Sequence, residues 1–161
     1  MAAVVIGPDG FLPPGRQRCT DEELHAGLVG AFPGSARRED LYNHWLLHRA
    51  ALAHLVPIAH QWINGSFVTG KEDPNDVDVV SFFDGPANDA LPQHLQMLVD
   101  TLLRGPYTKE AWRIDSYGVA VYPQGHPQHR PYLAARGYWD WWWGRVRDDD
   151  GMVKGYLEVV P

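Results

Sequence analysis

Cysteine is almost absent from this chain of 161 residues, in which Cys19 is the only one. A single cysteine cannot form an internal disulfide, so the composition favours a reducing compartment. Long hydrophobic runs are lacking too: the start has no signal-peptide pattern, and no segment reaches the roughly 18 apolar residues of a membrane span. We therefore expect a cytoplasmic protein with no membrane partner.

Positive charge is scarce as well. Lys and Arg number 14 against 20 Asp and Glu, which gives a net charge of −6. A general nucleic-acid-binding protein normally carries a basic patch, so this balance argues against that class. A nucleotide ligand is still allowed, because metal ions can offset the charge of its phosphates. With 45% hydrophobic residues, the chain predicts one globular domain over residues 1–161 with a sizeable core.

Capping signals predict most of the helices. Thr20 and Glu23 form a capping box at the start of a first helix. Ser35 can cap a second helix, in which apolar residues recur at three- and four-residue spacing. Asn88 can cap a third helix. The expected helices are 21–32, 36–55, 89–104 and 131–143.

The remaining segments predict a mixed sheet. Residues 60–63, 77–83 and 113–122 are rich in β-branched and aromatic residues or alternate as strands do. An extended arm is expected over 1–19, where proline and glycine recur. Segments 144–147 and 152–160 are expected to pair as a hairpin across an Asp-rich turn ending in Gly151. The predicted fold class is α/β (α+β): a mixed sheet flanked by helices, with a C-terminal hairpin.

The most informative segment places a Gly65-Ser66 turn ahead of two aspartates, Asp76 and Asp78. In a strand, residues i and i+2 point to the same face, so the two carboxylates would project side by side. They repel each other unless a cation lies between them. Mg²⁺ prefers oxygen ligands and is normally shared with substrate phosphates. The turn can offer backbone N–H groups and a hydroxyl to those phosphates.

A third carboxylate, Asp115, lies near the start of the third predicted strand. A carboxylate in an apolar strand is costly to bury without a partner, and a metal ion shared with the other two aspartates would be that partner. Two alternatives stay open. Asp115 can face solvent on an edge strand, or it can form a salt bridge with Arg113, which would share its face.

Lys71 follows the turn and stands within plausible reach of a bound triphosphate. A phosphate-binding lysine and a solvated loop lysine are both consistent with that position.

Aromatic residues crowd near the end of the chain, at Tyr138, Trp139 and Trp141 to Trp143. Such a cluster most often packs against a sheet, a protein partner or a second copy of the chain. An exposed aromatic platform can also stack a nucleobase.

Taken together, Gly65-Ser66, Gly70, the Asn75–Asp78 segment and Asp115 resemble the nucleotidyltransferase superfamily of the DNA polymerase β type. That superfamily carries a Gly-Ser motif, then Asp-x-Asp, then a further acidic strand. More narrowly, the chain resembles a functionally uncharacterised family of small bacterial and phage nucleotidyltransferase-like proteins. The additional likenesses are Phe11–Gly15 and a tail with Trp141–Gly144, Arg147 and Lys154-Gly155.

The resemblance implies a minimal nucleotidyltransferase fold and transfer of a nucleotidyl group from a nucleoside triphosphate to a hydroxyl. Gly65 and Ser66 would bind the triphosphate. Asp76 and Asp78 would hold two Mg²⁺ ions, and Asp115 would help to hold the ion that activates the hydroxyl. The wider superfamily suggests an RNA or protein acceptor, in a toxin–antitoxin or phage-defence setting.

The sequence also departs from the superfamily's pattern. Asn75 stands where many active relatives have serine, and no second domain for the base or the acceptor is evident. The alternative is therefore a catalytically silent module that keeps this fold and regulates a protein partner.

Overall fold

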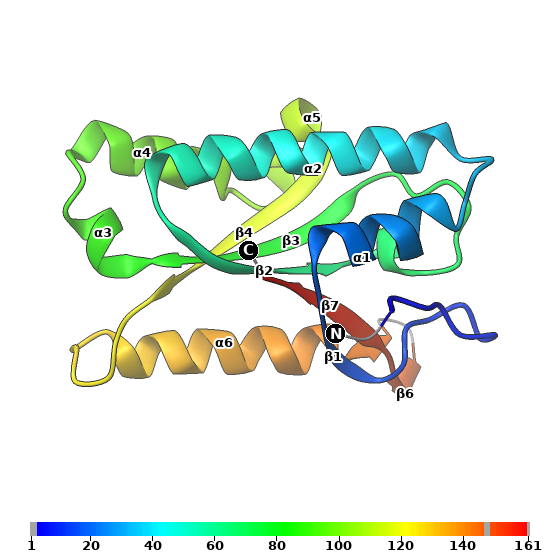
Figure 1. The fold of residues 1–161 in the computed structure, drawn as a ribbon. Coiled ribbons are helices and arrows are strands. Elements are labelled where there is room, and N and C mark those ends of the chain that lie inside the picture. The colour runs from blue at the N-terminus through cyan, green and yellow to red at the C-terminus, as the bar shows by residue number, and fades with distance from the viewer. Residues whose placement is uncertain (1–2, 147–148, 161) are drawn as a thin grey trace.

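The computed structural model describes residues 3–146 and 149–160 and has a mixed five-stranded sheet with helices on both faces (Figure 1). The strand order is β1-β7-β2-β3-β4. Helices α2, α4 and α5 lie on one face, and α6 lies on the other (Figure 1). The predicted mixed α/β class is therefore confirmed.

Strand pairing is parallel at both edges of this sheet and antiparallel in its middle. β3 and β4 run parallel, β2 is antiparallel to both β3 and β7, and β1 is parallel to β7. β3 is buried along almost its whole length because helices cover both faces, and its sequence is accordingly rich in Val and Phe. The strands of the sheet are β1 (Gly15–Cys19), β2 (Ile58–Asn64), β3 (Val77–Asp84), β4 (Ile114–Val121) and β7 (Gly155–Val159).

The helices with clear capping signals form as predicted. The Thr20–Glu23 capping box is present at the start of α1 (Asp21–His25), which continues as a π-helical turn, η1 (Ala26–Gly30). The Ser35 hydroxyl accepts the Arg38 backbone N–H and caps α2 (Ala36–Leu55). The fourth predicted helix is α6 (His129–Trp143). Local side-chain-to-backbone bonds thus fix the starts of α1 and α2, whereas α6 begins without a side-chain cap.

The prediction of one helix over 89–104 was wrong. The segment instead forms α3 (Gly85–Asp89) and α4 (Gln93–Leu102), and Asp84 rather than Asn88 provides the cap of α3. Pro92 causes the break, because a proline disfavours helical backbone in the residue before it. Two short helical segments follow: η3 (Pro106–Thr108) and α5 (Lys109–Trp112).

The two ends of the chain meet in the sheet, which the sequence did not predict. The expected arm contains β1, and β1 pairs with β7. A C-terminal hairpin is present between β5 (Arg145–Val146) and β6 (Asp149–Val153), but 155–159 is no part of it and enters the sheet between β1 and β2. A Cβ atom at Gly155 would lie 2.0 Å from the Pro13 carbonyl oxygen, so only glycine permits this approach. Asp148, in the predicted turn, lies outside the described residues.

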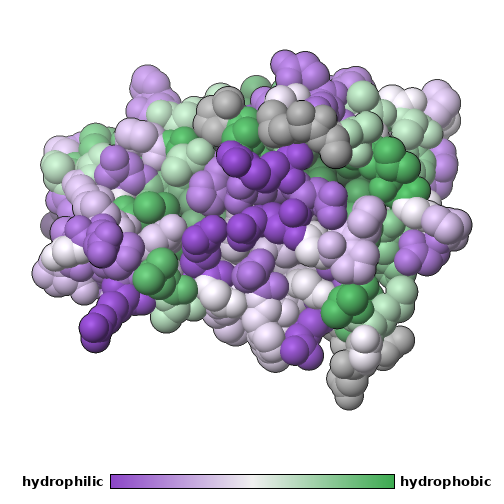
Figure 2. Space-filling model, turned by 60° about the horizontal axis from the view of Figure 1, so that its bottom comes forward, coloured by the Kyte–Doolittle hydropathy of each residue, from purple (hydrophilic) through white to green (hydrophobic). Residues whose placement is uncertain are grey.

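The side of the molecule that carries α6 is hydrophilic across its middle, with hydrophobic patches toward both ends (Figure 2). Charged residues of β1, β7 and α6 pair with one another here. Glu158 contacts the Nε atoms of Arg16 at 3.2 Å and Arg18 at 3.0 Å, and Arg16 also approaches Asp140. Within the described ranges, no helix is both long and apolar enough to cross a membrane.

Candidate functional site

The Gly65-Ser66 turn leaves the end of β2 and packs directly on an aspartate of β3. Gly65 has a φ of 79°, and a Cβ atom there would lie 2.6 Å from Oδ2 of Asp78. Glycine is therefore required twice, for the backbone conformation and for the approach of the carboxylate. Ser66 opens a short 3-10 helix, η2 (Ser66–Val68), and its carbonyl accepts the Thr69 hydroxyl at 2.7 Å.

One buried arginine holds the loop that follows the turn. Arg38 of α2 is 0% exposed, and its guanidinium donates five hydrogen bonds of 2.6–3.2 Å to backbone carbonyls. Those carbonyls belong to Leu28, Phe67, Thr69, Lys71 and Glu72. Four of the five lie in the loop, so Arg38 fixes its path beside the turn.

Parallel pairing of β3 and β4 sets two of the predicted aspartates opposite each other. Asp78 is the register partner of Asp115, and Asp76 lies just before β3. Burial, together with the charges of Asp76 and Asp115, raises the pKa of Asp78 from 3.8 to about 6. The structure therefore brings all three carboxylates within electrostatic range of one another.

A lysine that the sequence did not single out lies between two of these carboxylates. The Nζ atom of Lys109 is 2.7 Å from Oδ2 of Asp76 and 3.3 Å from Oδ2 of Asp115. The hydrogen bond to Asp76 is the main cause of a raised Lys109 pKa. Arg113, the alternative partner considered for Asp115, instead pairs with Asp40.

These residues fit a divalent cation by the kind of atoms they offer. Among residues 3–146 and 149–160, no group of three or more His, Cys, Asp and Glu side chains is arranged to hold a metal. Yet Oδ1 of Asp115 is buried and has no hydrogen-bond partner there, and carboxylate oxygens are the ligands that Mg²⁺ prefers. Asp76, Asp78 and Asp115 are the residues that would hold it.

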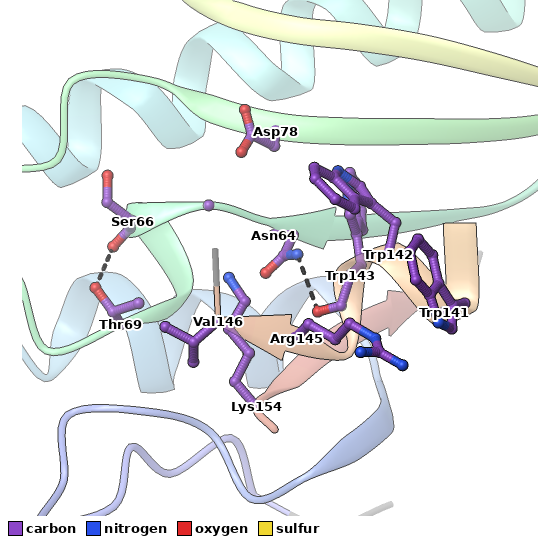
Figure 3. Close-up of a pocket in the computed structure, with 11 residues that line it drawn as sticks. Asn64, Ser66, Thr69, Asp78, Trp141, Trp142, Trp143, Arg145, Val146 and Lys154 are labelled. Carbon is purple, nitrogen blue, oxygen red and sulfur yellow. Dashed lines mark hydrogen bonds between the residues drawn. The ribbon is translucent and has the colours of Figure 1, made fainter. Parts of the chain in front are cut away.

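Asp78 and the turn line a pocket of about 470 Å³ (Figure 3). The turn and the Asp78 carboxylate lie at one side, and the tryptophans of α6 lie at the other (Figure 3). The lining residues are Asn64, Gly65, Ser66, Thr69, Asp78, Trp141, Trp142, Trp143, Arg145, Val146 and Lys154. The pocket therefore combines an acidic group, two basic side chains and an aromatic wall.

The tryptophan cluster divides between core and pocket. Trp143 is buried, and its carbonyl accepts the side-chain amide of Asn64 at 3.4 Å, which ties α6 to the end of β2. Trp141 and Trp142 are 53% and 40% exposed. The guanidinium of Arg145 lies 4.6 Å from the centre of the Trp141 ring, a cation–π contact.

Lys71 is an exposed loop residue, which agrees with the second of its two interpretations, a solvated loop lysine. Its backbone carbonyl accepts Arg38, and Lys71 is not among the residues that line the pocket. The basic side chains that do line it are Arg145 and Lys154. Lys154 belongs to the tail that carried part of the family resemblance, whereas nothing in the local sequence around Arg38 or Lys109 marks either as part of a site.

Comparison with known proteins assigns the family and no more. No curated protein and no solved structure matches the chain. The model of one family, described as a family of unknown function (DUF6932), matches residues 6–160. That match covers nearly the whole chain, and the protein belongs to the DUF6932 family.

Proposed function

We propose that this protein is a Mg²⁺-dependent nucleotidyltransferase that moves a nucleotidyl group from a nucleoside triphosphate to a hydroxyl of an RNA or protein acceptor. One observation carries the proposal. The Gly65-Ser66 turn and the Asp78 carboxylate are packed together at one side of a pocket of about 470 Å³, with Asp115 opposite Asp78 in the neighbouring strand.

The pocket's lining supports a nucleotide as the ligand. Arg145 and Lys154 supply positive charge for phosphate oxygens. Trp141 and Trp142 are partly exposed on the α6 side of the pocket, where the Arg145 guanidinium lies over the Trp141 ring, and base stacking on such rings is tolerant of base identity. A nucleoside triphosphate carries phosphates and a base in one molecule. The basic and the aromatic side chains together therefore suit it better than either kind alone.

The reaction would replace one phosphorus–oxygen bond by another. The acceptor's hydroxyl oxygen attacks the α-phosphorus, pyrophosphate leaves with the electron pair of the bond that breaks, and the hydroxyl proton passes to solvent. Bound Mg²⁺ would neutralise phosphate charge and make the hydroxyl more acidic. The chain's own residues would position the phosphates against the turn and hold the Asp78 carboxylate beside them.

A second candidate is a catalytically silent module that binds a protein partner. The observation in its favour is Lys109, whose ammonium contacts both Asp76 and Asp115 and offsets part of their negative charge. Such a module would keep the pocket and bind nucleotide without transferring it. A toxin–antitoxin or phage-defence setting is compatible with either candidate.

Labelling separates the two candidates. The wild-type protein is incubated with cell extract, Mg²⁺ and each of the four nucleoside triphosphates, radiolabelled at the α-phosphate. We expect RNA or protein to be labelled by the wild type and the double variant Asp76→Asn, Asp78→Asn to lose at least about a hundredfold of that activity, since transfer depends on the metal-held phosphates.

Asp100→Asn is the matched control, because Asp100 is an exposed carboxylate on α4, and this variant should label as the wild type does. Titration calorimetry of the same nucleotides gives the second reading. If a nucleotide binds but none labels an acceptor, the catalytically silent module is the correct candidate. If nucleotides neither bind nor label an acceptor, the pocket is not a nucleotide site.

A further inference from the structure

The ammonium of Lys109 joins two carboxylates that come from different parts of the fold. Asp76 precedes β3, Asp115 lies in β4, and Lys109 begins the short helix α5. Their contacts to Nζ are 2.7 and 3.3 Å. A positive charge at this point relieves the repulsion between the carboxylates, which is the same requirement that a divalent cation would meet.

The exposure of the three side chains shows which of them can move. The Lys109 side chain is 48% exposed, whereas those of Asp76 and Asp115 are 21% and 14% exposed. The lysine reaches the carboxylates from the solvent side on a flexible four-carbon stem. Rotation of that stem would release the carboxylates without unpacking the core.

The lysine satisfies the acidic group only in part. Two carboxylates share one ammonium, and Oδ1 of Asp115 stays buried without a hydrogen-bond partner in the described part of the chain. A divalent cation carries twice the charge and accepts several oxygen ligands at once, so it can compete for this place.

We propose that Lys109 is an internal counter-ion that occupies the cation position between Asp76 and Asp115, and that Mg²⁺ must displace it to load the site. The inference rests on the metal role given to these aspartates in the proposed function. Lys109 then acts in two opposite directions. It stabilises the metal-free fold, and it weakens Mg²⁺ binding.

Calorimetric titration of Mg²⁺ into the metal-free protein at constant ionic strength tests this directly. We expect Lys109→Met to bind Mg²⁺ about tenfold more tightly than the wild type, a difference of about 1.4 kcal/mol. Lys71→Met removes the same charge from a loop position away from the pocket lining, and it should leave the affinity unchanged. Lys109→Arg keeps a cation at the site and should stay close to the wild type.

Thermal unfolding supplies a reading that does not depend on activity. In the presence of a chelator, Lys109→Met should unfold at a lower temperature than the wild type. Addition of Mg²⁺ should raise the unfolding temperature of Lys109→Met by more than it raises that of the wild type. The proposal would be overturned if Lys109→Met bound Mg²⁺ no more tightly than the wild type. It would also be overturned if Lys71→Met gained as much Mg²⁺ affinity as Lys109→Met. If Lys109→Met does not fold without metal, a wild-type-like affinity in Lys109→Gln would overturn it.

The result is separable from the proposed function. If Lys109→Met binds Mg²⁺ more tightly but neither the wild type nor any variant transfers a nucleotidyl group, the counter-ion proposal stands and the proposed enzymatic function is wrong. Transfer by the wild type with unchanged Mg²⁺ affinity in Lys109→Met would do the reverse.

Discussion

Two cationic side chains hold the two halves of the candidate site, and they do so in opposite ways. Arg38 is fully buried and donates five hydrogen bonds to neutral backbone carbonyls, four of them on the Gly65 side. Lys109 is half exposed and pairs with two carboxylates on the acidic side. Loss of the guanidinium would remove the donor of five carbonyls at once, two of them in fully buried hydrogen bonds, whereas the carboxylates attract any cation that reaches them. The first is therefore a permanent part of the fold, and the second is exchangeable.

Substitution of Arg38 should have the largest effect on stability and tests whether this residue is a permanent part of the fold. Arg38→Met leaves five carbonyls without their donor, four of them in the loop beside the turn. We expect the free energy of unfolding to fall by about 4 kcal/mol, measured by urea denaturation. Arg37→Met is the control, since the Arg37 guanidinium donates to Asn75 on the surface and should contribute about 0.5 kcal/mol or less. A similar small loss in both variants would show that water can replace Arg38.

A methyl group at Gly65 tests the contact between the two halves. Gly65→Ala combines backbone strain at a φ of 79° with a Cβ atom 2.6 Å from the Asp78 carboxylate. We expect a loss of about 3 kcal/mol in urea denaturation and the loss of nucleotide binding in calorimetry. Gly125 has a φ of 90° and open space around its Cβ position, so Gly125→Ala isolates the strain and should lose only about 1 kcal/mol. Equal losses would mean that Asp78 moves aside at no cost.

The smallest expected effect comes from Asp78 in the acidic half of the site. Its substitution should stabilise the fold, whereas the two substitutions above should destabilise it. Since the pKa of Asp78 is raised from 3.8 to about 6, the folded chain holds a proton there that the unfolded chain has released, and stability falls as pH rises through this window. In chelator at neutral pH, Asp78→Asn should therefore raise the free energy of unfolding by about 1–2 kcal/mol, with little gain near pH 4. Asp100→Asn serves again as the exposed control. A destabilised Asp78→Asn at neutral pH would contradict the unfavourable environment of this carboxylate.

Local signals account for what could be predicted of the fold. The bounds of α2 follow from the Ser35 cap and the apolar spacing, and β3 follows from its β-branched and aromatic run. The break between α3 and α4 also has a local signal, because Pro92 disfavours helical backbone in the residue before it. The pairing of β1 with β7 had no local signal, since it joins opposite ends of the sequence.

The residues of the site also differ in whether a local sequence signal marks them. The spacing of Asp76 and Asp78 and the strand position of Asp115 were visible in the sequence, and the structure brings these residues together. Their metal role, and the phosphate role of Gly65 and Ser66, stay predictions. Arg38 and Lys109 were missed because each acts across the fold on residues far away in sequence, where no spacing rule applies.

The position of β7 between β1 and β2 has a consequence for synthesis of the chain on the ribosome. β1 is synthesised well before β7, and it lacks this neighbour until residues 155–159 follow. Lys154, which lines the pocket, lies directly before that strand. Pairing between such distant segments is slow to form, and domains complete their folding only when the needed segments are available. The pocket is therefore complete only after β7 has been synthesised, and binding of a nucleotide would report that β7 has joined β1 and β2.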